Sequence, residues 1–351
     1  MHSSRTRLAL IGATATLALS SGSPTFAQDT SVTPAAATTA PAATLDPTDT
    51  GYTVRIGFPS GNRDATASSP ADIWAQHQGL FDAVFKPATI TLDYQPFLGA
   101  GPAINEALIG NSLDVANYAD TAGVLGKTAG ADTSLVAIDE PSTAAWLVVK
   151  DDSPIHSVAD LKGKSVATIK ATFPHRFLLA VLAANGLTPD DIQFTNLSLP
   201  DSEVALDAGQ IDAAVTLGPN APRLLARGYR AIASTTDLPA AAGISVFAAT
   251  NPFLAAHPSF FPAYLAARDQ AVAWATANPN DAHQVLADSL KLTVDQAKQL
   301  YPSFDFTSAI TSAIVDRIKV TDQFLVDQGL APTALDVPAW VSPVAGGIVT
   351  P

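Results

Sequence analysis

The chain has 351 residues, of which 47% are hydrophobic and 15% charged, and its formal net charge is −13 at pH 7. So acidic a balance disfavours nucleic-acid binding, because phosphate contacts require clustered Lys and Arg. The absence of cysteine excludes a disulfide scaffold, thiolate metal ligands and a cysteine nucleophile.

The first residues have the pattern of an export signal. Arg5 and Arg7 precede an apolar run over 8–19 that is too short to span a bilayer, and Ala27 ends a segment suited to cleavage. We expect residues 1–27 to be removed, which leaves 17 basic against 32 acidic residues and a net charge of −15. An ordinary buried N-terminal helix is the alternative, and the next segment argues against it.

Residues 28–50 consist almost entirely of Ala, Thr, Pro, Ser and Asp, a composition with little apolar surface to bury. They predict a disordered linker ahead of a globular body that begins near Tyr52. No later apolar run is long enough for a transmembrane helix, and no cysteine offers a site for a lipid anchor. We therefore expect a secreted, soluble, periplasmic protein without direct membrane insertion.

The body alternates between strand and helix patterns. Period-two alternation predicts strands at 53–58, 89–97, 113–118, 165–169, 192–197 and 211–217. Apolar stripes predict helices at 71–85, 103–109, 176–185, 202–208, 260–277 and 309–328. Strands separated by helices indicate an α/β protein with mainly parallel sheets.

A weak internal repeat relates two stretches 98 residues apart (206 minus 108). Ala-Leu at 107–108 is followed by Leu-Asp-x-Ala at 113–116, and Ala-Leu at 205–206 is followed at the same distance by Ile-Asp-x-Ala at 211–214. We interpret the stretches as one copy in each of two lobes; chance similarity of common residues is the alternative.

Four strand-to-helix junctions, at 59–62, 119–122, 171–175 and 218–222, are candidates for ligand binding. Helix N-termini there offer free N–H groups and a dipole that favours an anion. At the third junction, His175 and Arg176 follow Thr172 and Pro174 in the first helical turn, where a cation is unfavourable unless an anion binds above it. The alternative is that both cations point to solvent. At the second junction, Thr121 and neighbouring N–H groups are predicted to hold ligand oxygens; the alternative for Asp120 is that its carboxylate simply caps the helix.

Enzyme and nucleotide motifs are missing from the sequence. The segment 99–104 resembles a dinucleotide fingerprint, but Ile104 replaces its third glycine. There is no Gly-x-Ser-x-Gly elbow and no His-Glu-x-x-His motif, and the six His residues are scattered. We expect no catalytic residues, no metal site and no cofactor.

The segment 153–167 is similar to the hinge-to-second-lobe signature of the periplasmic solute-binding proteins of the aliphatic sulfonate, taurine and nitrate group, the NMT1/THI5-like family. Segments 106–120, 185–192 and 199–214 extend the resemblance to about 52–330. It implies a type II periplasmic-binding-protein fold with the ligand in a hinged interlobe cleft. Lobe 1 would comprise 51–152 and 244–351, and lobe 2 would comprise 153–243. The implied partner is the membrane permease of an ABC importer, and we expect a monomer.

The family's ligand elements carry over only in part. Its Gly-Ser/Thr-x-x-His element matches Thr172 and His175, with Ala171 in place of Gly, and its Gly-Asp-x-Pro element retains only Asp120. Its Trp-Asp-Pro element becomes Leu-Gly-Pro at 217–219, and a Ser-Arg pair becomes Thr-Asn at 250–251, which removes an aromatic wall, an acid and a cation. Arg63 is the hypothetical replacement for the lost cation.

The predicted ligand site comprises Gly61, Asn62, Arg63, Tyr118, Asp120, Thr121, Trp146, Thr172, Phe173, His175, Gly218 and Asn220. In it, Trp146 would offer a stacking face. We expect capture of a small organic anion, a sulfonate or sulfate ester first, without turnover. The alternatives are nitrate or a pyrimidine or thiamine precursor as the solute, an enzyme on the same scaffold, and a sensor or adhesion module.

Overall fold

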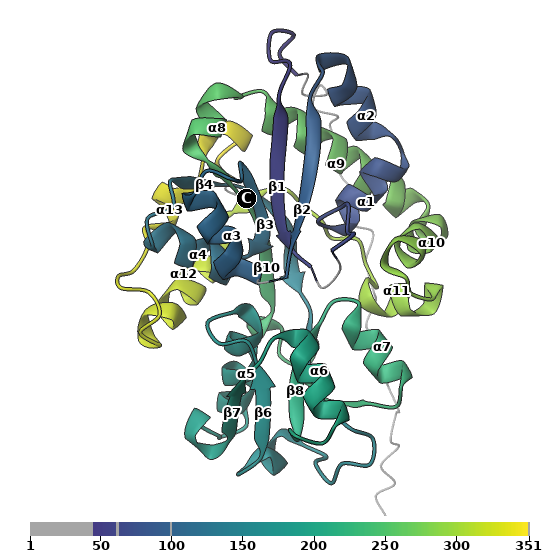
Figure 1. Cartoon of the computed structure of the whole chain (residues 1–351), viewed down its shortest axis with the longest axis vertical. Helices are drawn as coiled ribbons and strands as arrows, with labels where there is room; N and C mark the ends of the chain where they lie inside the picture. The colour runs from purple at the N-terminus through teal and green to yellow at the C-terminus, as the bar shows by residue number, and fades with distance from the viewer. Residues whose placement is uncertain (1–44, 61–62, 99, 350–351) are drawn as a thin grey trace, which may run out of the picture. The chain divides into compact units, whose positions relative to one another are not determined.

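The computed structural model describes residues 45–60, 63–98 and 100–349. Two five-stranded sheets have the orders β2-β1-β3-β10-β4 and β7-β6-β8-β5-β9, and β11 (Ile310–Thr311) pairs with β12 (Ile348–Val349). Helices cover both faces of each large sheet (Figure 1). The predicted α/β class with mainly parallel sheets is therefore confirmed. Within the described ranges, no helix combines the length and apolar character needed to cross a bilayer.

The first sheet contains β1 (Thr53–Pro59), β2 (Thr91–Phe97), β3 (Val115–Ala119), β4 (Thr133–Thr143) and β10 (Gly243–Thr250). One face packs against α1 (Pro70–His77), α2 (Leu80–Phe85), α8 (Asn251–Ala256), α9 (Phe260–Ala277), α10 (Pro279–Leu290) and α11 (Val294–Leu300). The other packs against α3 (Ala100–Ile109), α4 (Asp120–Thr128), α12 (Ser312–Asp327) and α13 (Val337–Trp340). Helices thus bury both faces of the sheet. Because alternate residues of a strand point to opposite sides, Val115 joins one core and Ala116 joins the other.

The second sheet contains β5 (Ala145–Val149), β6 (Ser165–Thr168), β7 (Gln193–Asn196), β8 (Ala213–Leu217) and β9 (Arg230–Ser234). One face packs against α5 (Phe173–Ala184), and the other against α6 (Leu199–Asp207) and α7 (Asn220–Ala226).

Two predicted helices differ in their bounds. The helix predicted over 71–85 is two helices, because Gly79 takes φ 67° between α1 and α2, a left-handed conformation that glycine adopts at little cost. The helix predicted over 309–328 begins at Ser312, since the two residues before it form β11, and Thr311 caps α12 by accepting a hydrogen bond from the Ile314 N–H at 3.2 Å.

The chain passes between the two sheets twice, from β4 to β5 and from β9 to β10. The strand after each crossing, β5 or β10, is antiparallel to its neighbours, whereas β1 and β6 pair in parallel with theirs. Sequence analysis assigned residues up to 152 to lobe 1, but β5 pairs with β8 and β9. Hereafter lobe 1 means the described residues up to 143 and from 243 onward, and lobe 2 means 145–241.

The internal repeat marks equivalent positions in the two lobes. Asp114 accepts a hydrogen bond from the backbone N–H of Arg55 at 2.9 Å, and Asp212 accepts one from that of Ser165 at 2.8 Å. Asp114 lies just before β3 and holds β1, and Asp212 lies just before β8 and holds β6; these strands occupy equivalent places in the two sheet orders. The interpretation of one copy per lobe is confirmed.

Candidate ligand-binding site

A cavity of about 740 Å³ lies between the lobes. Lobe 1 lines it with the ends of β1, β3 and β4 and the starts of α1, α3 and α4, and lobe 2 with the segments after β6 and β8. These are the carboxyl ends of parallel strands, the position at which open α/β sheets bind ligands.

Three residues of lobe 1 that line this cavity each have a buried polar side-chain atom without a hydrogen-bond partner among the described residues. The atoms are Asn117 Nδ2, Tyr118 Oη and Thr121 Oγ1. Each residue is at most 3% exposed. A buried polar group without a partner costs roughly 1–3 kcal/mol. Their position, from the end of β3 into the first turn of α4, therefore indicates a ligand with hydrogen-bond acceptors.

Helix N-termini from both lobes open onto the same space. Thr121 lies in the first turn of α4, and the lining also includes Phe173 at the start of α5 and Pro70 at the start of α1. First-turn N–H groups have no carbonyl partner within their own helix and carry the positive end of its dipole. The backbone thus supplies a positive potential to the cavity.

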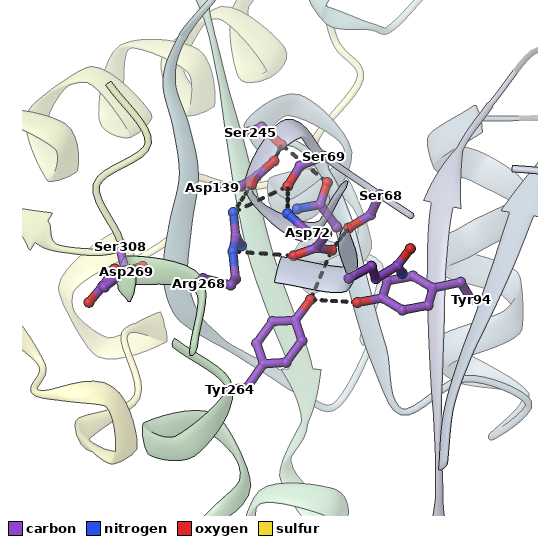
Figure 2. A network of polar contacts seen from close by, with 12 residues as sticks. Ser68, Ser69, Asp72, Tyr94, Asp139, Ser245, Tyr264, Arg268, Asp269 and Ser308 are labelled. Carbon is purple, nitrogen blue, oxygen red and sulfur yellow. Dashed lines mark hydrogen bonds and ion pairs between the residues drawn. The ribbon is translucent and has the colours of Figure 1, made fainter. Parts of the chain in front are cut away.

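The charged side chains of the described lining are both acidic: Asp139 and Glu140, near the end of β4. Behind Asp139 lies Arg268 of α9, only 1% exposed, which forms ion pairs with Asp139 and with Asp72 (Figure 2). Asp72 also accepts a hydrogen bond from Tyr264 Oη at 2.9 Å. One guanidinium therefore serves two buried carboxylates.

Glu140 has no such cation beside it in the described chain. Its carboxylate accepts a hydrogen bond from Thr143 Oγ1 at 3.3 Å. Burial, together with the charge of Asp139, raises the pKa of Glu140 to about 8. Burial also raises the pKa of Asp72, although Arg268 opposes that rise. This end of the cavity, which we call the acid pole (Asp139 and Glu140), holds more carboxyl groups than cations.

The lobes contact each other around the cavity. Arg223 of α7 donates to the Leu290 carbonyl at the end of α10 at 2.6 Å. At the second crossing, Arg176 of α5 and Arg317 of α12 donate to the Ala242 carbonyl at 2.8 and 3.4 Å. The contacts hold the two walls of the cavity together.

The cavity brings together five of the predicted site residues: Tyr118, Thr121, Thr172, Phe173 and Gly218. Arg63 is exposed and is not part of the lining. Gly61 and Asn62 lie outside the described residues.

Three further predicted residues point elsewhere. Asp120 is fully buried and accepts a hydrogen bond from Thr321 Oγ1 at 2.6 Å, which joins α4 to α12. Strand alternation places Trp146 on the face of β5 beneath α6 and α7. Asn220 accepts a hydrogen bond from Arg223 at 3.3 Å.

His175 is also outside the lining. Its ring packs against Phe194 and Phe324, with centroid distances of 5.1 and 6.2 Å, and its Nδ1 accepts a hydrogen bond from the Ala171 N–H at 3.4 Å. Burial and, secondarily, the charge of Lys170 lower the pKa of His175. The lowered pKa favours the neutral ring, and the ring lies outside the lining in which sequence analysis expected a cation.

Sequence analysis missed the polar residues from β4 and β10. Ser245 Oγ donates to Asp139 at 3.0 Å and contacts Asn117 Oδ1 at 3.3 Å, so one hydrogen-bonded group joins three strands. A signal was present: the acidic pair at 139–140 ends an apolar run and precedes a proline. No cluster of His, Asp and Glu suited to a metal ion occurs in the described part of the chain.

The family model described as NMT1/THI5 like matches residues 73–282. The chain belongs to this family. A protein of Escherichia coli K12 named for binding aliphatic sulfonates is 33% identical over 195 residues, 55% of this chain and 60% of that protein. The alignment thus spans less than two thirds of that relative. A Brucella abortus (strain 2308) protein named as a binding protein is 28% identical over 250 residues, 70% of this chain and 73% of its own.

Solved structures share the fold. The periplasmic aliphatic sulphonate binding protein SsuA of Escherichia coli has a TM-score of 0.70 at 26% identity, covering 83% of this chain and 92% of its own. The alkanesulfonate-binding protein SsuA of Xanthomonas axonopodis pv. citri, bound to MOPS, has a TM-score of 0.70 at 25% identity, with coverages of 86% and 99%. The desulfurization enzyme DSZB, at 18% identity and a TM-score of 0.64, covers 84% of this chain and 97% of its own and shares the fold alone. The protein therefore has the periplasmic-binding-protein fold.

Proposed function

We propose that this protein is the solute-binding component of an ABC-type importer and that it captures a small organic anion, a sulfonate or sulfate ester, between its lobes. The observation that carries the proposal is the set of unpartnered donors Asn117, Tyr118 and Thr121 beside the N-terminus of α4 in an interlobe cavity. A sulfonate offers three oxygen acceptors to such donors. The relatives named for sulfonate binding support the same class of solute.

The size and lining of the cavity favour an anion that carries an apolar body. A volume of about 740 Å³ greatly exceeds that of nitrate. Leu125 of lobe 1 and Phe173 and Leu217 of lobe 2 contribute apolar walls. An aliphatic or aromatic group would gain about 25 cal/mol for each Å² of apolar surface it buries there.

In the proposed cycle, a periplasmic monomer takes up the solute, the lobes close about the two crossings, and the closed form delivers the solute to a membrane permease. The crossing segments provide the hinge, since each lobe has its own cores. No chemical conversion of the solute is part of this cycle.

Thermal unfolding of residues 28–351 against a panel of solutes tests the proposal. The panel comprises alkane- and arylsulfonates, sulfate esters, nitrate, bicarbonate and pyrimidines. A ligand at 100 times its Kd should add about 2.7 kcal/mol of stability. We expect this shift with an organic sulfonate or sulfate ester. A shift with neutral compounds only would contradict the anion site, and product formation would contradict a transport function.

A further inference from the structure

Two hydrogen bonds join the lobes outside the ligand cavity. Arg223 of α7, in lobe 2, donates to the Leu290 carbonyl of α10, in lobe 1, at 2.6 Å. Gln296 of α11, in lobe 1, donates in the opposite direction, to the Pro222 carbonyl of α7 at 3.4 Å. We call this pair of hydrogen bonds the latch. None of its four residues lines the cavity, so any effect of the latch on binding acts through the positions of the lobes.

The acceptor at Leu290 suits a cation. Leu290 is the last residue of α10, and the carbonyls of a last helical turn have no N–H partner within the helix. Lys291 follows with φ 55° and ends the helix. A helix C-terminus also carries the negative end of the helix dipole, which favours a guanidinium there. Arg223 therefore satisfies an acceptor of lobe 1 that α10 itself leaves without a donor.

The donors of the latch are held by residues of their own lobes. Arg223 donates to Asn220 Oδ1, one turn earlier in α7, at 3.3 Å, and forms no ion pair with a carboxylate among the described residues. Gln296 Oε1 accepts from the Thr293 N–H at 2.9 Å, which leaves its NH₂ group to donate to Pro222. Asn220, which sequence analysis placed in the ligand site, thus orients a latch residue.

The latch lies to one side of the crossings. Figure 1 shows α7 facing α10 and α11 on one side of β10, with α5 and α12 on the other side. The hydrogen bonds of Arg176 and Arg317 end instead on the Ala242 carbonyl, within the second crossing. Rotation of the lobes about the crossings moves most the contacts that lie farthest from them. Opening therefore breaks the latch, whereas the contacts at Ala242 are compatible with both arrangements of the lobes.

We propose that Arg223 sets the affinity of the protein from outside the cavity, by stabilising the closed lobes whichever solute lies between them. The inference rests on the proposed function and adds a control of affinity to it. The acceptors of the latch are backbone carbonyls, and none of its residues lines the cavity. The apparent Kd rises as the population of closed lobes falls. Loss of the latch therefore weakens the binding of every solute by the same factor and leaves selectivity unchanged.

The absence of cysteine allows the lobe positions to be measured directly with attached dyes. Val204→Cys in α6 and Val320→Cys in α12 place one dye on each lobe, at positions 67% and 62% exposed. Single-molecule energy transfer then counts closed and open molecules without any solute. We expect Arg223→Gln to lower the closed-to-open ratio about tenfold, because the hydrogen bond lost has a charged donor. Arg223→Lys, which keeps a cation and a donor, should restore part of the ratio.

Arg227→Gln is the matched control. Arg227 follows Arg223 by one turn and caps the C-terminus of α7, but its ion pairs with Glu203 and Asp207 lie within lobe 2. Its loss should leave the closed-to-open ratio unchanged. An equal shift in Arg223→Gln and in this control would assign the effect to a disturbed α7 and overturn the proposal.

Titration calorimetry with two probes, 1-octanesulfonate and MOPS, measures the consequence for binding. Arg223→Gln should raise both Kd values by the same factor of about ten, and Arg227→Gln should raise neither. Unchanged Kd values, or a loss confined to one probe, would overturn the latch proposal and leave the anion proposal standing. If neither probe binds the wild type, the anion proposal fails, and the closed-to-open ratio still decides on the latch: a ratio unchanged by Arg223→Gln would overturn it.

Discussion

The two lobes present different chemistry to the same cavity. Lobe 1 contributes Asn117, Tyr118, Thr121, Asp139 and Glu140. The lining residues of lobe 2 are apolar or glycine, with the exception of Thr172. The hydroxyl of Thr172 already donates a hydrogen bond to the Ile169 carbonyl at 2.6 Å. The polar groups available to a ligand therefore come mainly from one lobe.

This contrast arises within a shared architecture. In both sheets the strand that follows a crossing, β10 or β5, lies fourth and antiparallel to both neighbours, and the aspartates of the repeat hold equivalent strands. The lobes diverge where strands end and helices begin, which are the positions that meet the ligand. We infer that lobe 1 recognises the solute and that lobe 2 covers it.

The largest effect on affinity should come from removing the unpartnered hydroxyls of lobe 1. The double variant Tyr118→Phe with Thr121→Val should weaken binding of the cognate anion by about 100-fold or more, since hydrogen bonds to charged groups contribute about 1.5–3 kcal/mol each. Stability without ligand should not fall, because neither hydroxyl has a partner in the described structure. Calorimetry and thermal unfolding measure the two quantities.

Thr133→Val is the matched control for that variant. Thr133 Oγ1 is also buried without a partner in the described residues, but it does not line the cavity. Its removal should leave affinity unchanged. If the double variant and this control lost the same affinity, the residues at the end of β3 would have no specific part in recognition.

The acid pole should make the stability of the empty protein depend on pH. Glu140 has a folded pKa of about 8 against an ordinary value of 4.5. Between these values the folded state holds more protons than the unfolded state, so this group lowers stability as pH rises. Glu140→Gln should match the wild type near pH 4.5 and exceed it at pH 8.5 by on the order of 2 kcal/mol. Urea unfolding across this window measures the difference, and a gap independent of pH would contradict the role of Glu140.

A truncation in lobe 2 should have a smaller effect on affinity. Leu217→Ala removes part of the apolar cover and should weaken binding by no more than about tenfold, the equivalent of roughly 1.4 kcal/mol. Leu197→Ala, a truncation of the same lobe outside the lining, is the control. If Leu217→Ala lost more affinity than the lobe 1 double variant, lobe 2 would contribute more to recognition than lobe 1.

Local patterns predicted much of the fold. The strands ahead of the junctions and the helices after them follow from alternation and helical periodicity, and the junctions led correctly to Thr121 and Thr172 as residues of one cavity. The strands β4, β5, β9 and β10 were not predicted. Their pairings join distant residues, as in the register of Ser245 with Glu140, and no local pattern encodes such partners.

Side-chain direction was the other limit on prediction. Sequence analysis placed His175 and Trp146 in the site, but strand alternation turns Trp146 away and aromatic neighbours bury His175. The acid pole was missed because the balance of charge there depends on Arg268, which lies more than a hundred positions away. That guanidinium is already shared between two carboxylates.

The smallest predicted effect concerns the rim of lobe 2 at Ala171, where the family element has glycine. Ala171 takes φ 65°, a left-handed conformation that costs an L-residue with a Cβ roughly 1 kcal/mol. Ala171→Gly should relieve this strain and raise the free energy of unfolding by up to about 1 kcal/mol, less the entropy that glycine adds to the unfolded chain. Chemical denaturation measures it. Affinity should change by less than about twofold, since lobe 2 contributes cover rather than polar contacts. A large gain or loss of affinity would show that the backbone at Ala171 takes part in recognition. It would contradict the inference that lobe 1 recognises the solute and lobe 2 only covers it.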